Sequence, residues 1–363
     1  MTTLTEQAVL AALSTVKDPL MNRDLVTLKA VNKVEIKGGT VGVEIVLGYP
    51  ALGVRETLGE AVLQALLALE GVDSADVDLG WYVHPAPVSN SQAAIANVKN
   101  IVAVSSGKGG VGKSTTTVNL ALALVAEGAK VGILDADIYG PSQPQMLGVG
   151  AQRPEGHGNN QMKPIEAHGV QSISMGYLVT EKTPMAWRGP MVSGALQQLL
   201  NQTLWQDLDY LLIDMPPGTG DIQLTLSQHV PVTGAIIVTT PQDIALLDAQ
   251  KGIEMFRKVN VPVLGVVENM STHICSQCGH EESIFGSGGG ERIAKDYQSE
   301  LLGALPLDLS IRHNADSGQP SVVADPQSDI TRIYKEIARK VGARLWAEQQ
   351  QGSAMPEITI SDD

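Results

Sequence analysis

The sequence predicts an α/β protein: a domain with a mostly parallel sheet flanked by helices, preceded by a small α+β domain. From residue 99 onward, short runs rich in β-branched residues alternate with helical patterns. These runs are apolar throughout, which is typical of strands buried on both faces of a parallel sheet. They lie at residues 101–105, 130–135, 211–214, 235–239 and 263–268. A length of 363 residues also favours two domains.

Composition and charge restrict the class of protein. Hydrophobic residues make up 43% of the chain and charged residues 18%, as in ordinary globular proteins. A formal net charge of −14 argues against broad binding to nucleic acid or to anionic membranes. No apolar run reaches the roughly 18 residues of a membrane span, and the N-terminus lacks the pattern of a signal peptide. We therefore expect a cytoplasmic protein with no nucleic-acid or membrane partner.

Residues 1–84 have the pattern of the small α+β domain. Residues 6–16 are helical in pattern, and two predicted strands at 25–36 and 40–47 flank a Gly38-Gly39 turn. Apolar residues then recur at helical spacing over 58–69, and a last strand is predicted at 76–81. No catalytic constellation is present in this region. Residues 85–98, rich in proline and polar residues, are predicted to be a linker to a second domain at 99–350.

A nine-residue string at the end of the first strand of that domain predicts a nucleotide site. Residues 107–115 read Gly-Lys-Gly-Gly-Val-Gly-Lys-Ser-Thr, between an apolar strand and an alanine-rich helical run. A strand, glycine loop and helix in this order point backbone N–H groups at phosphate oxygens. The domain is therefore predicted to be a P-loop NTPase that binds ATP. The expected contact residues are Gly107, Lys108, Gly109, Gly110, Val111, Gly112, Lys113, Ser114 and Thr115.

Individual side chains of this loop have distinct expected roles. Lys113 is expected to reach the β- and γ-phosphates, and Ser114 to contact Mg²⁺. Lys108 follows the first glycine directly, where a lysine points away from its own phosphates. Its position is explained if it reaches a nucleotide bound by a second subunit, which predicts a homodimer.

Polar residues at the ends of other strands are expected to complete the nucleotide site, because ligands of open α/β sheets bind at the carboxyl ends of strands. Asp137 is the predicted water-positioning residue, with Asp135 as its support. Asp214 follows four apolar residues, as in the second magnesium signature of P-loop enzymes. Gly218 could offer a backbone N–H to the γ-phosphate from a switch loop. Asn269 could read the adenine ring.

Three segments outside the nucleotide site have weaker signals. The Gly/Asn/Gln-rich segment 148–162 is predicted to be a loop. Residues 329–350 have an amphipathic helical pattern with a basic face. Such a helix either docks on the sheet with a solvated face, which we favour, or lies on a membrane surface. The acidic tail 351–363 argues against the membrane alternative, because anionic lipid would repel it.

The two cysteines of the chain form a Cys-X-X-Cys pair in this same domain. Cys275 and Cys278 lie in the segment His-Ile-Cys-Ser-Gln-Cys-Gly-His. They could hold zinc together with His273 and His280, although the tetrahedron would be cramped. They could form a redox disulfide, or they could be inert thiols. They could also be half of a cubane iron–sulfur site, since such clusters are commonly held by four cysteines and two chains would supply them.

Several strings together resemble one family, the Mrp/ApbC-type iron–sulfur cluster carrier ATPases with a deviant lysine loop. The resemblance covers nearly the whole chain, including the domain at 1–84. The matching segments are residues 107–115, 135–142, 187–190, 208–221, 239–242, 268–271 and 284–286, with the Cys275/Cys278 pair. Residues 135–142 match the first switch of the family. The strings at 187–190, 208–221, 239–242 and 268–271 and the cysteine pair are highly specific to the family.

The resemblance implies a function that the spacing of residues does not supply. It implies an ATP-hydrolysing homodimer that binds a 4Fe–4S cluster between Cys275 and Cys278 of both chains. The cluster would come from a cluster-assembly scaffold and pass to apo iron–sulfur proteins, with slow ATP hydrolysis. Some domains similar to residues 1–84 carry a cysteine after the second strand, but residues 49–53 have none. Interaction with targets is therefore the expected role of this domain.

Two rival functions belong to other classes. One is a spatial-organising ATPase that cycles on a membrane or on DNA, against which the net charge, the acidic tail and the cysteine pair all argue. The other is an ATP-driven electron donor with a permanently held redox cluster. In that type of protein the cluster cysteines of each subunit are far apart in sequence, unlike the adjacent pair here.

Overall fold

The structure is a computed structural model that describes residues 4–87, 93–158, 160–178, 189–275 and 277–352. The chain folds into two compact units. The small unit contains residues 1–87 and 342–363, and the large unit contains residues 88–341. Within the described part of the chain, no helix is both long enough and apolar enough to cross a membrane.

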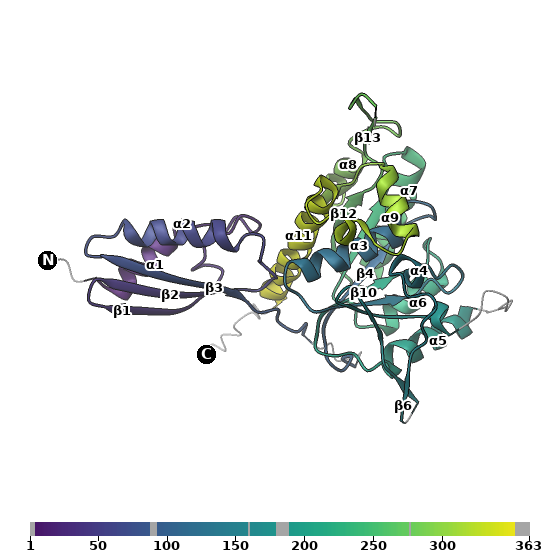
Figure 1. Ribbon diagram of the computed structural model, residues 1–363, viewed down its shortest axis with the longest axis horizontal. Coiled ribbons are helices and arrows are strands. Elements are labelled where there is room, and N and C mark those ends of the chain that lie inside the picture. The colour runs from purple at the N-terminus through teal and green to yellow at the C-terminus, as the bar shows by residue number, and fades with distance from the viewer. Residues whose placement is uncertain (1–3, 88–92, 159, 179–188, 276, 353–363) are drawn as a thin grey trace, which may run out of the picture. The chain divides into compact units, whose positions relative to one another are not determined.

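The small unit packs two helices against a three-stranded sheet (Figure 1). In the sheet, β2 lies in the middle, antiparallel to β1 and parallel to β3. Inward-facing residues of β2 alternate with outward-facing ones, as expected for a sheet with one buried face. The elements are α1 (Glu6–Leu13), β1 (Val31–Lys37), β2 (Thr40–Leu47), α2 (Arg55–Leu67) and β3 (Ser74–Trp81).

The first strand is shorter than the predicted 25–36. The residues before Val31 form turns, in which the Asp24 carboxylate accepts a hydrogen bond from the backbone N–H of Thr27 at 2.8 Å. Lys29 has a positive φ of 55°, which no regular strand accommodates. Leu25 and Leu28 are nevertheless buried in the core. Their apolar character therefore reflects burial in a turn, which sequence periodicity does not separate from burial in a strand.

The C-terminal helix contributes to both units. The first turns of α11 (Asp329–Gly352) pack in the large unit, where a Cβ on Gly303 would lie 2.6 Å from the Ile337 side chain. Its last turns belong to the small unit, where Trp346 stacks at a tilt on Tyr49 with 6.0 Å between ring centroids. A Cβ on Gly48 would lie 2.3 Å from the Trp346 ring, so only glycine allows this approach. Docking on the large sheet was expected, but the role of Trp346 in the small core was not.

The large unit is built on an eight-stranded sheet in the order β15-β12-β11-β4-β10-β5-β9-β8. Every neighbouring pair is parallel except β8 and β9. The mostly parallel sheet predicted from the sequence is therefore confirmed. The strands are β4 (Val98–Ser105), β5 (Val131–Asp135), β8 (Ile165–Ala167), β9 (Val170–Ser174), β10 (Leu208–Asp214), β11 (Gly234–Thr239), β12 (Val263–Glu268) and β15 (Leu301–Ala304).

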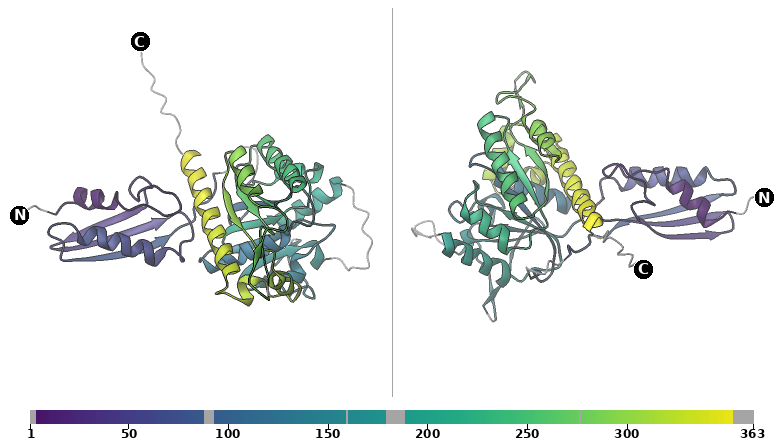
Figure 2. Two further views of the ribbon diagram at one scale, coloured as in Figure 1. Left: turned by 90° about the horizontal axis from the view of Figure 1, so that it is seen from above. Right: turned by 180° about the vertical axis from the view of Figure 1, so that it is seen from behind.

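Helices cover both faces of this sheet (Figures 1 and 2). One layer contains α3, α9, α10 and the first part of α11, and the other contains α5, α6 and α7. The helices of this unit are α3 (Lys113–Ala126), α4 (Gln143–Met146), α5 (Gly189–Gln202), α6 (Asp221–His229), α7 (Asp243–Lys258), α8 (Gly289–Asp296), α9 (Leu309–Asp316) and α10 (Ser321–Ala324).

All five predicted strands are present, but the sheet has three more. Strands β8, β9 and β15 have only three to five residues each and include polar residues or glycine, so their apolar runs are short. The segment 148–162, predicted to be a loop, contains a small hairpin of β6 (Gly156–His157) and β7 (Gln161–Met162). Residues 187–188 of one family string, part of the predicted linker and residues 353–363 of the acidic tail lie outside the described residues.

Candidate functional site

The glycine loop adopts the strand–loop–helix geometry predicted for phosphate binding. It leaves β4 at Ser105 and enters α3 at Lys113. Gly110 and Gly112 have φ values of 81° and 83°, which favour glycine. A Cβ on Gly107 would lie 2.1 Å from the backbone of Asp248 in α7, closer than any real contact. Glycine is therefore required at these positions by backbone conformation or by close packing.

The loop lysine is paired with a carboxylate at the end of β10. The Lys113 ammonium donates to Asp214 Oδ1 at 2.5 Å and lies 3.2 Å from Ser114 Oγ. Both charges are removed from solvent, with 6% of the Lys113 side chain exposed and none of Asp214. A buried charge without a partner is very unfavourable. Lys113 can therefore leave Asp214 only when another anion, such as a phosphate, takes its place.

Asp135 and Asp214 lie side by side at the ends of β5 and β10, where they are register partners. Burial, and next the charge of Asp214, raises the pKa of Asp135 to about 7. The backbone N–H of Gln143 and the Ser174 hydroxyl donate to Asp135 Oδ2 at 3.2 and 3.0 Å and oppose this rise in pKa, as does the Lys113 charge. The backbone N–H of Ser142 donates to the same oxygen at 3.1 Å. Asp135 therefore holds the segment that follows it and is not positioned as a free base.

Asp137 differs from Asp135 because it is only partly buried. Its Oδ1 accepts a hydrogen bond from the backbone N–H of Gly140 at 3.3 Å. Burial raises the pKa of Asp137, and the nearby Lys113 charge partly opposes that shift. A partly exposed carboxylate near the loop lysine can reach a water molecule, whereas the enclosed Asp135 cannot. The water-positioning role predicted for Asp137 stays a prediction.

The proline–glycine loop after β10 is held against the phosphate loop in this structure. Gly218 has a φ of 99°, and its backbone N–H donates to the Ser106 carbonyl at 2.9 Å. The Gln223 side chain of α6 donates to the Pro217 carbonyl at 2.6 Å. A γ-phosphate contact by the Gly218 N–H, as predicted, would require this bond to Ser106 to break. Such a rearrangement fits a loop that changes with nucleotide state.

Asn269 contacts the phosphate loop through its side chain. Its amide donates to the Val111 carbonyl at 2.9 Å, and its Oδ1 accepts from the Met270 N–H. A Cβ on Gly112 would lie 2.1 Å from Asn269 Nδ2, so the loop and this amide are closely packed. Asn269 therefore supports the loop in this structure. The adenine contact predicted for it stays a prediction.

Lys108 is the remaining predicted catalytic residue of the loop. It is partly exposed, and its backbone carbonyl accepts a hydrogen bond from the Ser106 hydroxyl at 2.8 Å. Its ammonium pairs with none of the residues that the structure describes. This is compatible with a partner outside the chain, which the sequence predicts to be the nucleotide of a second subunit.

The sequence pattern missed Gln143, which is fully buried beside the two strand-end carboxylates. Its side-chain amide donates to Asp214 Oδ2 at 2.9 Å and to the Ser114 carbonyl at 3.1 Å. Thr117 of α3 also donates to Asp214, at 3.2 Å. The only sequence signal for Gln143 was its place directly after the first-switch string 135–142, which no residue pattern singles out. The carboxylate of Asp214 thus accepts hydrogen bonds from side chains of two helices, α3 and α4.

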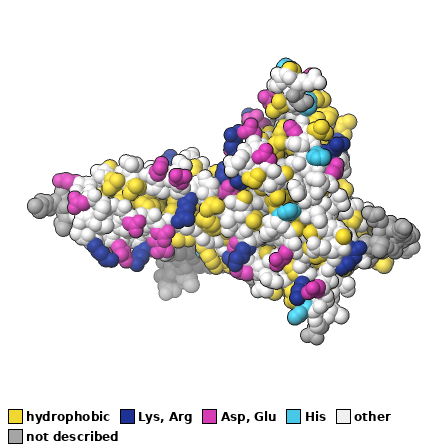
Figure 3. Space-filling model, viewed as in Figure 1, with side chains coloured by type: hydrophobic (Ala, Val, Ile, Leu, Met, Phe, Trp, Pro, Cys, Tyr) yellow, Lys and Arg dark blue, Asp and Glu magenta, His cyan; other side chains and the backbone are white. Residues whose placement is uncertain are grey.

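The two cysteines lie on a short hairpin away from this edge of the sheet (Figure 1). Strands β13 (His273–Ile274) and β14 (Glu281–Glu282) pair antiparallel. The Cys275 N–H donates to the His280 carbonyl at 2.9 Å, and the Gly279 N–H donates to the Cys275 carbonyl at 2.9 Å. Cys275 is partly buried and Cys278 exposed, and Figure 3 shows histidine side chains near the same tip. Ser276 lies outside the described residues.

The backbone around Cys275 favours its thiolate. The N–H groups of Gln277 and Cys278 and the Cys278 thiol, in that order, lower the pKa of Cys275. A thiolate is the form of cysteine that binds metals and clusters. Among the described residues, no three His, Cys, Asp or Glu side chains come together as one metal site. His273 instead bonds the Leu307 carbonyl at 3.1 Å. The described part of one chain therefore offers two thiol ligands.

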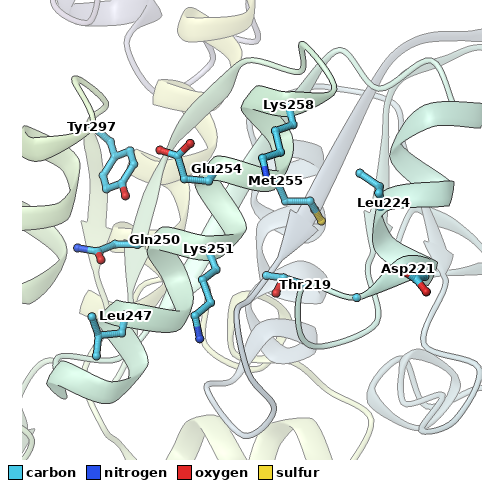
Figure 4. A pocket seen from close by; sticks show the side chains of 11 residues that line it. Thr219, Asp221, Leu224, Leu247, Gln250, Lys251, Glu254, Met255, Lys258 and Tyr297 are labelled. Atoms are coloured by element: carbon cyan, nitrogen blue, oxygen red, sulfur yellow. The ribbon is translucent and has the colours of Figure 1, made fainter.

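A pocket of about 580 Å³ lies beside the loop that follows Pro217 (Figure 4). Thr219, Asp221 and Leu224 line it on one side, and residues of α7 such as Lys251 and Met255 line it on the other. None of the strand-end carboxylates or phosphate-loop residues lines this pocket. It is therefore distinct from the nucleotide edge, although it shares the switch loop with it.

The fold and the site define a P-loop nucleotide-binding protein with an exposed dithiol hairpin. Residues 97–342 match the ParA family described as NUBPL iron-transfer P-loop NTPase, and residues 6–79 match the iron-sulfur cluster assembly protein family. The chain therefore belongs to the family of iron–sulfur cluster carrier P-loop NTPases. The resemblance drawn from its motifs is confirmed.

Individual relatives support this family assignment. The chain is 54% identical to the iron-sulfur cluster carrier protein of Salmonella typhimurium, over 96% of this chain and 94% of that protein. It is 53% identical to the mouse iron-sulfur cluster transfer protein NUBPL, over 70% and 80% of the two chains. Among solved structures, a nucleotide-binding protein from Archaeoglobus fulgidus in complex with ADP has a TM-score of 0.57 and 36% identity, over 64% of this chain and 90% of that one.

Proposed function

We propose that this protein is an ATP-hydrolysing homodimer that carries a 4Fe–4S cluster between two chains and transfers it to apo iron–sulfur proteins. The cluster is its cargo, bound by Cys275 and Cys278 of each chain. A cluster-assembly scaffold supplies it, and no nucleic acid or membrane takes part. The observation that carries the proposal is the hairpin, which presents two thiols to solvent beside backbone donors that favour the thiolate.

The number of thiols supports a site shared between chains. The whole sequence contains two cysteines, both on this hairpin, and cubane clusters are commonly held by four. Two hairpins related by a two-fold axis supply that number. A cluster at such an exposed junction is accessible to an incoming protein, as transfer requires. A buried cluster would instead suit permanent electron transfer.

The nucleotide edge supports binding and hydrolysis of Mg·ATP. Triphosphate oxygens would replace Asp214 as partners of Lys113, which keeps the lysine charge compensated. The donor set fits Mg²⁺, which prefers oxygen ligands, because the Ser114 hydroxyl and the Asp214 carboxylate both lie within hydrogen-bond distance of the Lys113 ammonium. Bound Mg²⁺ would supply neutralisation of phosphate charge. Asp137 would orient the attacking water, and Lys108 of a second chain would stabilise the developing charge.

A short segment connects the phosphate loop with the cysteine hairpin. Asn269 bonds the loop carbonyl of Val111, and the hairpin begins four residues later at His273. Between them, Ser271 is tied to Leu305 through both its N–H and its hydroxyl, at 2.9 and 3.0 Å. A displacement of the loop on ATP binding would therefore reach the hairpin through a well-bonded segment. This supports the proposal that nucleotide state alters the geometry of the cysteines.

The test is the content of iron and sulfide per dimer after anaerobic reconstitution. We expect about four of each in the wild type and none in Cys275→Ala/Cys278→Ala. His280→Ala is the matched control, because a zinc site would need this histidine whereas a thiolate-bound cluster would not. Tight zinc that depends on His280, or a cluster bound by a single chain, would contradict the proposal.

A transfer assay tests the carrier step separately. Reconstituted protein is mixed with an apo enzyme whose activity requires a 4Fe–4S cluster, with and without ATP. We expect activity to appear with the wild type and to change with ATP, but not to change with ATP when Lys113→Ala carries the cluster. Transfer unaffected both by ATP and by Lys113→Ala would refute the coupling.

A further inference from the structure

Gln143 connects the two halves of the nucleotide edge. Its backbone N–H donates to Asp135 Oδ2 at 3.2 Å, and its side-chain amide donates to Asp214 Oδ2 at 2.9 Å and to the Ser114 carbonyl at 3.1 Å. It is fully buried although it belongs to the first turn of the short helix α4. One residue therefore bonds both strand-end carboxylates and the backbone of the phosphate loop.

The chemistry of these neighbours fixes the orientation of the amide. Asp214 Oδ2 and the Ser114 carbonyl are both hydrogen-bond acceptors, so the NH₂ group of Gln143 must face them. Rotating the amide by a half turn would place its oxygen against two other oxygens. The oxygen Oε1 consequently faces away from both, and it is buried with no hydrogen-bond partner among the described residues. A buried acceptor left unpaired is costly, and such groups commonly mark the place of an absent ligand or water.

We infer that Gln143 is a positioning residue for the magnesium ion of bound Mg·ATP. Its NH₂ group holds the Asp214 carboxylate in place after Lys113 has turned to the phosphates. Its Oε1 is an acceptor available to the hydration shell of the ion, since Mg²⁺ usually keeps several waters. This inference rests on the proposed binding of Mg·ATP and adds a residue that links the metal to the first-switch segment.

The test compares two glutamines of the same short helix. Gln143→Met keeps the length and approximate shape of the side chain but removes both its donor and its acceptor. Gln145→Met is the matched control, because the exposed Gln145 bonds the Asp316 carbonyl and none of the strand-end carboxylates. Binding of a non-hydrolysable ATP analogue is measured by calorimetry, once in EDTA and once with Mg²⁺. The readout is the ratio of the two Kd values.

We expect Mg²⁺ to tighten analogue binding in the wild type and in Gln145→Met. In Gln143→Met this tightening should fall about tenfold, as for loss of a hydrogen bond to a charged group, so that the Kd rises more in the presence of Mg²⁺ than in EDTA. An undiminished tightening in Gln143→Met would overturn the inference. Equal weakening with and without Mg²⁺ would also overturn it, since that result indicates only a structural role. A wild type that binds no nucleotide would refute the proposed function itself.

Hydrogen exchange of the wild type keeps the inference testable if Gln143→Met does not fold. Amide exchange of residues 139–147 is followed with the ATP analogue in EDTA and again with Mg²⁺. We expect added Mg²⁺ to slow exchange in this segment, because the ion would complete the bonds of Gln143. Identical exchange in the two conditions would overturn the link between the metal and the first switch.

Discussion

The nucleotide edge of the sheet and the cysteine hairpin differ in how much of each site a single chain assembles. At the sheet edge, Lys113 and Asp214 are buried and bonded to each other, and further donors surround the carboxylate. On the hairpin, two thiols lie at an exposed tip that two short strands support. At the sheet edge the charged groups of one chain already compensate each other, whereas the two thiols of the hairpin have no further ligand group beside them among the described residues. The two regions should therefore respond differently to mutation.

The largest expected effect is at the buried ion pair. Lys113→Met should lower ATP hydrolysis about 100-fold or more, because it removes a preorganised charge facing the phosphates. Iron and sulfide bound per chain after reconstitution should stay near the wild-type value, since the hairpin does not contact Lys113. Steady-state phosphate release and iron analysis measure the two. Loss of iron together with hydrolysis would mean that the two regions are one site.

Two glycines, one in the phosphate loop and one in the cysteine hairpin, allow the two regions to be compared by the same substitution. Gly112 and Gly279 have φ values of 83° and 70°. A Cβ on Gly112 would lie 2.1 Å from Asn269 Nδ2, whereas a Cβ on Gly279 would meet nothing within 4 Å. Both alanine variants should lose about 1–2 kcal/mol of stability from backbone strain. Only Gly112→Ala should also weaken ATP binding, by about tenfold or more, because the loop must move away from Asn269.

Thermal unfolding and nucleotide titration distinguish the two contributions for this pair. If Gly279→Ala weakened ATP binding as strongly as Gly112→Ala, a change in the hairpin would be shown to alter the phosphate loop. The two regions would then not respond differently to mutation.

The buried carboxylates predict a pH dependence of stability for the metal-free protein. The pKa of Asp135 is raised from its ordinary value of 3.8 to about 7. Between these values the folded protein holds a proton that the unfolded chain has released, so raising the pH lowers the free energy of unfolding. The slope from this one group is at most about 1.4 kcal/mol per pH unit. Asp135→Asn should remove it.

Asp243→Asn is the control for this measurement, because that carboxylate is 91% exposed. Urea unfolding at several pH values between about 4 and 7 gives the slopes. A wild type whose stability rises with pH in this window, relative to Asp135→Asn, would contradict the raised pKa.

The smallest expected effect concerns the reactivity of Cys275 in the cluster-free protein. Backbone donors lower its pKa, so more thiolate is present at neutral pH than in an unstructured peptide. Alkylation of Cys275 by iodoacetamide should therefore be a few-fold faster than in a peptide of the same local sequence. Cys278→Ala should slow it, because one donor is lost. Mass spectrometry over a pH series measures the rates, and a titration midpoint equal to that of the peptide would contradict the prediction.

The sequence predicted the parts of the site that depend on local chemistry. The phosphate loop follows a strand and opens a helix, so its glycines at 107–112 and Lys113 could be located from the sequence alone. The carboxylates could be located because each follows a predicted strand. The mostly parallel sheet could be predicted because its strands are buried on both faces and are therefore apolar throughout. The short strands β8, β9 and β15 were missed because so few residues carry too little periodicity.

Contacts between distant segments could not be predicted. Gln143 is ordinary in its local sequence, and its position between Asp135 and Asp214 arises only when three segments meet. For Asn269, the sequence predicted a contact with adenine, but it could not predict the hydrogen bond to the Val111 carbonyl, which is distant in sequence. The bond between Gly218 and Ser106 likewise joins residues more than a hundred positions apart. Residue types indicated the chemistry, but long-range packing decided which groups are already paired.

Because Trp346 is part of the core of the small unit, this unit cannot complete its folding early in translation. Ala343 and Trp346 pack in the same cluster as Tyr49 and Val9, although nearly the whole chain separates them. During translation the N-terminal part of a protein leaves the ribosome first and generally folds first. Here residues 4–87 precede the large unit in the chain, but their core lacks Ala343 and Trp346 until α11 has been made. A chain truncated after residue 340 would therefore have an incomplete core in the small unit, although residues 4–87 would all be present.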